Sequence, residues 1–134
     1  MVRAAGLAVV GLAVAVGFGW AFSERQQPND VDEFMQLKLE HAQDLLEALA
    51  TEDFEAAAKH SQEISLLSQQ ATWQVLQTPE YNQHSSEFRR SADAVSLAAR
   101  ERNIDAASLA YVDMTMKCFN CHKYVRGAKM ASAK

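Results

Sequence analysis

The chain has few of the residues that end helices or form turns. Its 134 residues include five glycines and two prolines, and four of the glycines lie within the first 19 positions. After position 23 only Gly127, Pro28 and Pro79 remain. Because glycine and proline are the residues that most often interrupt a helix, their scarcity predicts long helices joined by few, short loops.

Cysteine and positive charge are also scarce. The two cysteines stand three positions apart near the C-terminal end, which excludes a scaffold held together by disulfides spread along the chain. The formal net charge of −4 gives no overall basic surface for nucleic acid, so no nucleic-acid partner is expected. With 49% hydrophobic and 22% charged residues, the chain has the composition of a globular domain and not of a disordered segment.

Residues 1–23 form a separate N-terminal segment. Arg3 is its only charged side chain, and the 19 residues from 4 to 22 are all apolar or glycine. This run is long for a signal-peptide core and just short of the roughly 20 residues that span a bilayer. Ala21-Phe22-Ser23 resembles a signal-peptidase site. We expect either a cleaved signal peptide or a retained membrane anchor, and both export residues 24–134 to the periplasm or an equivalent compartment.

Apolar side chains recur every three or four positions after residue 30 and divide the rest of the chain into four helices. The first is expected from residue 31 to about residue 50. The second begins after Thr51 as its cap and continues to the break at 78–80, where Thr78 caps the third helix and Pro79 is its first residue. The fourth is expected over about 106–128, with Gly127 as its stop. Residues 24–134 are therefore predicted to form one all-α domain, an antiparallel up-and-down four-helix bundle.

The fourth helix carries the most informative motif. Cys118-Phe119-Asn120-Cys121-His122 is the C-x-x-C-H pattern of c-type haem attachment. Positions i, i+3 and i+4 of a helix share one face, so both thiols can add to the vinyl groups of a single haem lying against that face. The imidazole of His122 is then placed as the axial iron ligand. The pattern predicts one covalently attached haem c.

Two other readings of the cysteine pair are weaker. A redox-active dithiol normally stands at the start of a helix that follows a strand, whereas this pair lies deep in a late helix. A structural zinc site needs about four ligands, and the chain has no second cysteine pair to complete one.

A four-helix bundle that follows an export signal and carries C-x-x-C-H on its last helix resembles the cytochrome c prime family. Arg126, four residues after His122, matches a basic residue that this family commonly carries beside the axial histidine. Tyr124-Val125 is a departure, since the family usually has its aromatic residue immediately before the arginine. The resemblance implies electron transfer, or binding of NO or CO at an open iron site. It also implies an apolar lid from the first helix, for which Leu39 has the matching position.

Two residues of the first helix are alternatives as a sixth iron ligand, which would make the protein a six-coordinate electron carrier. Met35 lies near the centre of the apolar stripe, where ordinary core packing is the simpler interpretation. His41 lies at the edge of the stripe, and we expect it to be partly exposed. His60 and His84 fall near polar faces and receive no role. No distal His/Arg pair supports a peroxidase, so no enzymatic activity and no catalytic residue are predicted.

Basic residues dominate the C-terminal end. No acidic residue follows Asp113, and the cations there are Lys117, Lys123, Arg126, Lys129 and Lys134. Some of them complement the helix dipole. They also predict a positive rim around the haem edge that attracts an acidic redox partner protein. A homodimer is left open.

Overall fold

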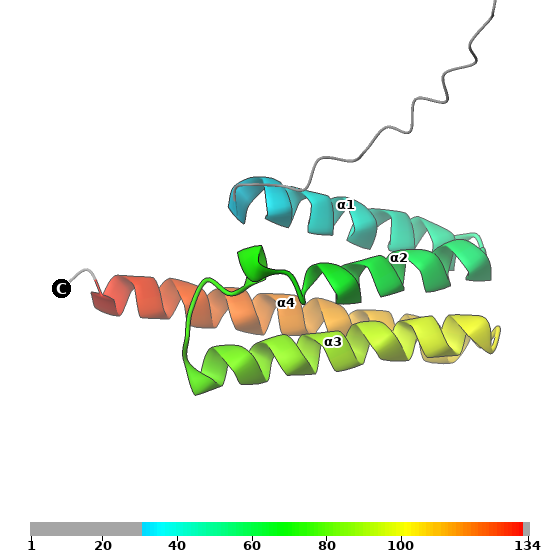
Figure 1. Cartoon of the computed structure of the whole chain (residues 1–134). Coiled ribbons are helices and arrows are strands. Elements are labelled where there is room, and N and C mark those ends of the chain that lie inside the picture. The colour runs from blue at the N-terminus through cyan, green and yellow to red at the C-terminus, as the bar shows by residue number, and fades with distance from the viewer. Residues whose placement is uncertain (1–30, 133–134) are drawn as a thin grey trace, which may run out of the picture.

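The computed structural model describes residues 31–132, so the expected export segment lies outside the described residues, as do the tether 24–30 and Lys134. The described residues form four α-helices and one short 3-10 turn, whose arrangement can be followed in Figure 1. They are α1 (Val31–Ala50), α2 (Phe54–Leu67), η1 (Ala71–Trp73), α3 (Pro79–Arg100) and α4 (Ile104–Ser132). The described part of the chain contains no strand. The prediction of an all-α four-helix bundle is confirmed.

The first two helices meet at a tight turn. The side chain of Asp53 caps α2 by accepting a hydrogen bond from the backbone N–H of Ala56 at 3.0 Å. The prediction that Thr51 caps this helix is therefore wrong. The Thr51 hydroxyl instead donates back to the carbonyl of Glu47 in α1 at 2.9 Å. The true cap lies two residues later because the chain needs residues 51–53 to reverse its direction.

The second helix ends at Leu67, about ten residues earlier than expected. The chain turns inward after Ser68 and buries Trp73, which is 2% exposed. The indole stacks on Phe88 and meets Phe34 edge-on, with ring centroids 5.4 Å and 6.2 Å away. Its N–H donates to the hydroxyl of Ser85 at 2.7 Å. Burying this large aromatic side chain with its N–H satisfied outweighs the helical continuation that the periodicity predicted.

The predicted boundaries of the third and fourth helices are partly confirmed and partly wrong. Thr78 caps α3, accepting from the N–H of Tyr81 at 3.1 Å, and Pro79 is the first helical residue, as predicted. The fourth helix begins at Ile104 and continues through Gly127 to Ser132, so the predicted stop at Gly127 is wrong. A glycine that ends a helix adopts a positive φ, and Gly127 does not.

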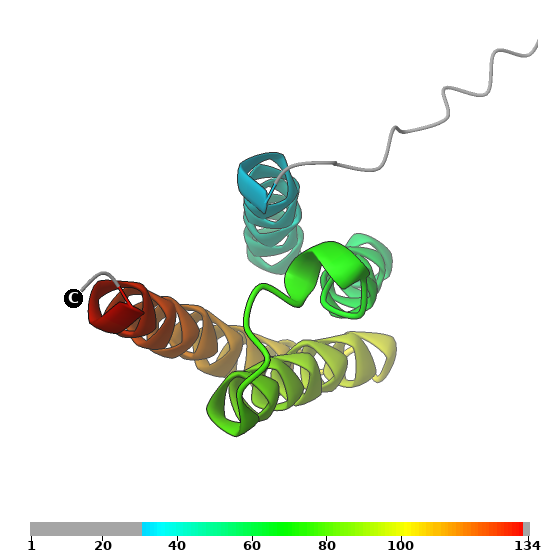
Figure 2. The same ribbon diagram turned by 60° about the vertical axis from the view of Figure 1, so that its left-hand side comes forward.

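The packing of the helices is uneven. α3 packs along α4 and α2, and α1 packs along α2, but α1 and α4 make few contacts with each other. Figure 2 shows the start of α1 and the end of α4 spread apart, with η1 between α1 and α3. The bundle therefore opens between its first and last helices. None of the described helices is long and apolar enough to cross a membrane.

Candidate cofactor site

The C-x-x-C-H motif lies in the second half of α4, on the part that faces this opening. Cys121 is buried, Cys118 is half-buried, and His122 is exposed. Both cysteines are free thiols. Because the three side chains stand at i, i+3 and i+4, the helix presents them on one side of its surface. The helix thus places the three predicted attachment residues on one side, with Cys121 and His122 at the open edge of the bundle.

A cavity of about 550 Å³ adjoins the motif. Cys121 and His122 line it from α4, Met35 lines it from α1, and the buried rings of Trp73 and Tyr81 also line it. Cys118 is not among the lining residues and packs instead at the edge of the core one turn earlier. This volume lies in the usual range for cofactor and small-molecule sites, which are mostly apolar.

Lys38 is an unexpected lining residue. Its side chain is 7% exposed, and its ammonium nitrogen lies 4.1 Å from the ring centroids of both Trp73 and Phe88. Aromatic faces attract a cation at this distance. Even so, burial lowers the pKa of Lys38, an effect that negative charge on Cys118 and Cys121 would oppose. The cavity therefore holds a cationic side chain close to the cysteine pair.

The surrounding side chains also shift the pKa values of the residues in the C-x-x-C-H motif. Burial raises the pKa of both cysteine thiols, and the positive charge of Lys38 acts in the opposite direction. A smaller thiolate fraction makes a thiol slower to oxidise. Partial desolvation lowers the pKa of His122, and the charges of Lys38 and Arg126 lower it further. The lowered pKa favours the neutral imidazole, which is the form that ligates a metal.

Two of the three residues expected near the iron, apart from the motif itself, lie at the cavity. Met35 and Arg126 both line it. Leu39 does not line it and is 50% exposed, which corrects its predicted role as the distal lid. The reason is the helical period: Leu39 follows Lys38, and one residue turns the side chain by about 100°. Because Lys38 points inward, Leu39 points away from the cavity.

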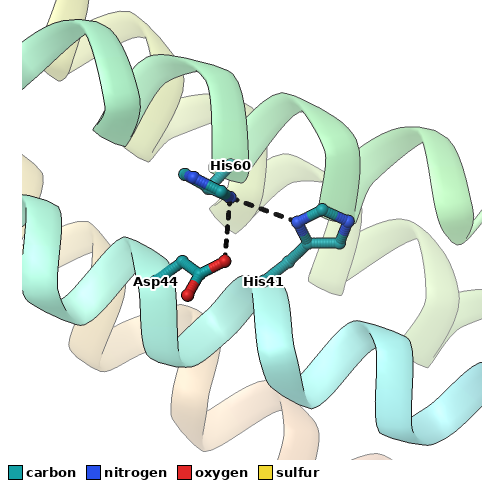
Figure 3. A group of neighbouring side chains, drawn as sticks. All are labelled: His41, Asp44 and His60. Carbon is teal, nitrogen blue, oxygen red and sulfur yellow. Dashed lines mark hydrogen bonds and ion pairs between the residues drawn. The ribbon is translucent and has the colours of Figure 1, made fainter.

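His41 also differs from its expectation. It is 7% exposed and does not line the cavity. The prediction that His41 is partly exposed is therefore wrong. Its ring packs against His60 of α2, as Figure 3 shows. Nothing in this arrangement directs His41 toward His122.

Three of the five basic C-terminal residues have a clear place in the structure. Arg126 and Lys129 line the cavity and are exposed to solvent. Lys117 instead lies 3.6 Å from Asp113 of its own helix and 3.9 Å from Glu87 of α3, and only the second ion pair connects α4 to α3. Arg126 and Lys129 therefore place positive charge at the cavity, which exposed Asp32 of α1 also lines, and Lys117 pairs with acidic side chains away from it.

Sequence reasoning missed Lys38 and Trp73. A signal for Lys38 was present, because a single lysine interrupts the buried stripe formed by Phe34, His41 and Leu45. Trp73 gave no comparable signal, since it lay within an apparently continuous helical pattern.

Comparisons with protein-family models, with curated proteins and with solved structures find no match to this chain.

Proposed function

We propose that this chain is an exported monohaem c-type cytochrome of the cytochrome c prime type, in which Cys118 and Cys121 form thioether bonds to one haem and His122 is its axial ligand. The observation that carries the proposal is the position of C-x-x-C-H beside a cavity of about 550 Å³ at the one edge where the described helices separate. A motif match by chance would have no reason to border such a cavity.

The residues present fit a haem in their chemistry. Free thiols and a neutral imidazole are the groups needed for attachment and ligation, and the thiols are free in this structure. Trp73, Tyr81 and Val125 supply apolar lining. Arg126 and Lys129 lie where their charges can offset the propionates. A bound haem would supply an iron that changes oxidation state and binds small gases.

The surrounding side chains favour electron transfer or gas binding over catalysis. Among residues 31–132, His122 is the only histidine that lines the cavity, so a distal His/Arg pair of the kind that cleaves an O–O bond is not supported. Exposed Arg126 and Lys129 provide positive charge beside the proposed haem, which would guide an acidic redox partner. The chain's own residues would then bind the cofactor, shield one face and steer the partner.

A six-coordinate electron carrier is the second candidate. Met35 of α1 lines the same cavity as His122 of α4, and a thioether is an established axial ligand in cytochromes. The sequence raised Met35 and His41 as a sixth iron ligand. Only Met35 lines the cavity, because His41 packs against His60 of α2.

Covalent attachment is the test of the proposal. Protein made in cells that carry out c-type haem attachment should keep its haem after denaturation in acidified organic solvent, with a mass increase equal to one haem. Cys118→Ala/Cys121→Ala should release any bound haem into the solvent. Free haem extracted from the unchanged protein, or a chain isolated without haem from such cells, would contradict the proposal.

A further inference from the structure

A second cluster of potential ligands lies between α1 and α2, and none of its residues lines the cavity beside the C-x-x-C-H motif. His41 and Asp44 are three positions apart on α1 and therefore share one face. His60 approaches them from α2, as Figure 3 shows. His41 is buried, His60 is half-buried and Asp44 is exposed, so the cluster extends from the core to the surface.

The ligand atoms converge closely. The Nδ1 atoms of His41 and His60 lie 3.2 Å apart, and Nδ1 of His60 lies 3.7 Å from a carboxylate oxygen of Asp44. One ligand atom from each residue falls within 4.8 Å of the other two. A hydrogen bond between the two Nδ1 atoms needs one ring nitrogen to donate and the other to accept, so the two side chains turn the same ring atom toward each other.

This spacing matches the coordination geometry of zinc. Tetrahedral Zn²⁺ with Zn–N bonds of about 2.0–2.1 Å holds its ligand nitrogens about 3.3 Å apart. The two Nδ1 atoms are already close to that separation. The Asp44 oxygen lies 3.7 Å from Nδ1 of His60 and within 4.8 Å of the His41 ligand atom, so it needs to move toward the two nitrogens. An exposed aspartate can make this movement through its side-chain torsions alone.

We propose that His41, Asp44 and His60 form a binding site for a divalent transition metal ion of the zinc type. Two imidazoles and one carboxylate are ligands typical of zinc, and three protein ligands leave the fourth position for water. For both Nδ1 atoms to bind the ion, each neutral imidazole carries its proton on Nε2, so the histidine that donates in the Nδ1–Nδ1 hydrogen bond first moves that proton to its own Nε2 by exchange with solvent. The ion joins α1 to α2 and fastens the helix that makes few contacts with α4.

The proposal does not depend on the haem, and its test separates the two. Zinc is titrated into the chelator-treated full chain by calorimetry, and the expected result is one ion bound with a dissociation constant of roughly 10 µM or lower. When the free zinc concentration is about 100 times the dissociation constant, the melting temperature of the chain should rise by roughly 5 °C or more. His60→Ala should weaken binding by at least about 100-fold and remove the thermal shift.

The matched control is His84→Ala, which removes a half-buried histidine of α3 that packs against Tyr124. It should bind zinc as the unchanged chain does. Free thiols of Cys118 and Cys121 are also zinc ligands, so anomalous scattering from crystals grown with zinc should locate the ion between the Nδ1 atoms of His41 and His60. An ion that still lies between α1 and α2 in crystals of His60→Ala, an ion located only at the thiols, or no binding near 10 µM would overturn the proposal.

Discussion

Lys38 shows how one side chain can influence both the core and the candidate cofactor site. Its ammonium lies over two aromatic rings in the interior of the bundle, beside the cavity bordered by Cys121 and His122. Cation–π contact of this kind contributes about 2 kcal/mol when desolvated, whereas burying a charge without an ionic partner costs several kcal/mol. The lowered pKa of Lys38 agrees with desolvation as the larger effect.

We predict that Lys38→Met raises the free energy of unfolding at pH 7 by roughly 1–2 kcal/mol, because methionine keeps the unbranched stem without the buried charge. The folded-state pKa of Lys38 lies below its value of about 10.5 in the unfolded chain. Between these two pKa values the unfolded chain holds more protons, so stability from this group increases with pH.

Urea unfolding at pH 7 and pH 10 measures both effects, and the gain from Lys38→Met should shrink at the higher pH. Lys59→Met, at an exposed position on α2, is the control and should change little. A loss of stability in Lys38→Met would show that the aromatic contacts outweigh desolvation.

At the scale of elements, the two turns 51–53 and 101–103 repeat one another. Glu52 and Arg102 both have φ 55°, in the left-handed region. The following residues, Asp53 and Asn103, each cap the next helix by accepting from a backbone N–H three residues on, at 3.0 Å. Each also donates its own N–H back across the turn, to Ala48 or Ala98. This is the Schellman arrangement, in which glycine is the usual left-handed residue.

Two substitutions in the first turn should therefore have opposite effects. Glu52→Gly should stabilise the protein by about 0.5–1 kcal/mol, because glycine adopts the left-handed conformation without strain. Asp53→Ala should destabilise it by about 1 kcal/mol through loss of the cap. Urea unfolding of the two variants beside the unchanged chain provides the measurement. A less stable Glu52→Gly variant would mean that the Glu52 side chain has a stabilising role that its backbone conformation does not indicate.

At the scale of the whole molecule, the opening between α1 and α4 decides which side chains can reach a bound cofactor. Because α1 packs mainly on α2, its His41 points there, and only the first two turns of α1 border the cavity. The α1 side chains that line it are Val31, Asp32, Met35 and Lys38. Val31 and Met35 are the apolar ones among them, whereas Leu39, the expected apolar lid, does not line the cavity.

For the proposed cytochrome we predict a mainly five-coordinate, high-spin ferrous iron, since Met35 is expected to pack and not to ligate. Absorption and resonance Raman spectra report the coordination directly. Met35→Leu and His41→Ala should leave the spectra nearly unchanged. Leu39→Ala, at a half-exposed position outside the cavity, should leave both the spectra and the rate of carbon monoxide association unchanged. A low-spin iron that becomes high-spin in Met35→Leu would identify the six-coordinate carrier.

The sequence predicted the helices well and their ends less well. Pro79 after Thr78 marked the start of α3 because this pair acts through local backbone geometry alone. The end of α2 could not be predicted, because it depends on the stacking of Trp73 on Phe88 and on its hydrogen bond to Ser85, both of which are contacts with α3. Gly127 misled the prediction, since a glycine ends a helix only when its φ becomes positive.

What the sequence determined by itself is local: the four helices, the apolar stripes that bury them, and the shared face of Cys118, Cys121 and His122. These follow from helical periodicity and spacing, which require no knowledge of distant residues. Only the tertiary structure decided that Lys38 and not Leu39 faces the cavity, and that His41 meets His60. Those outcomes depend on how each helix is rotated about its axis, and that rotation is set by packing against partners far away in the chain.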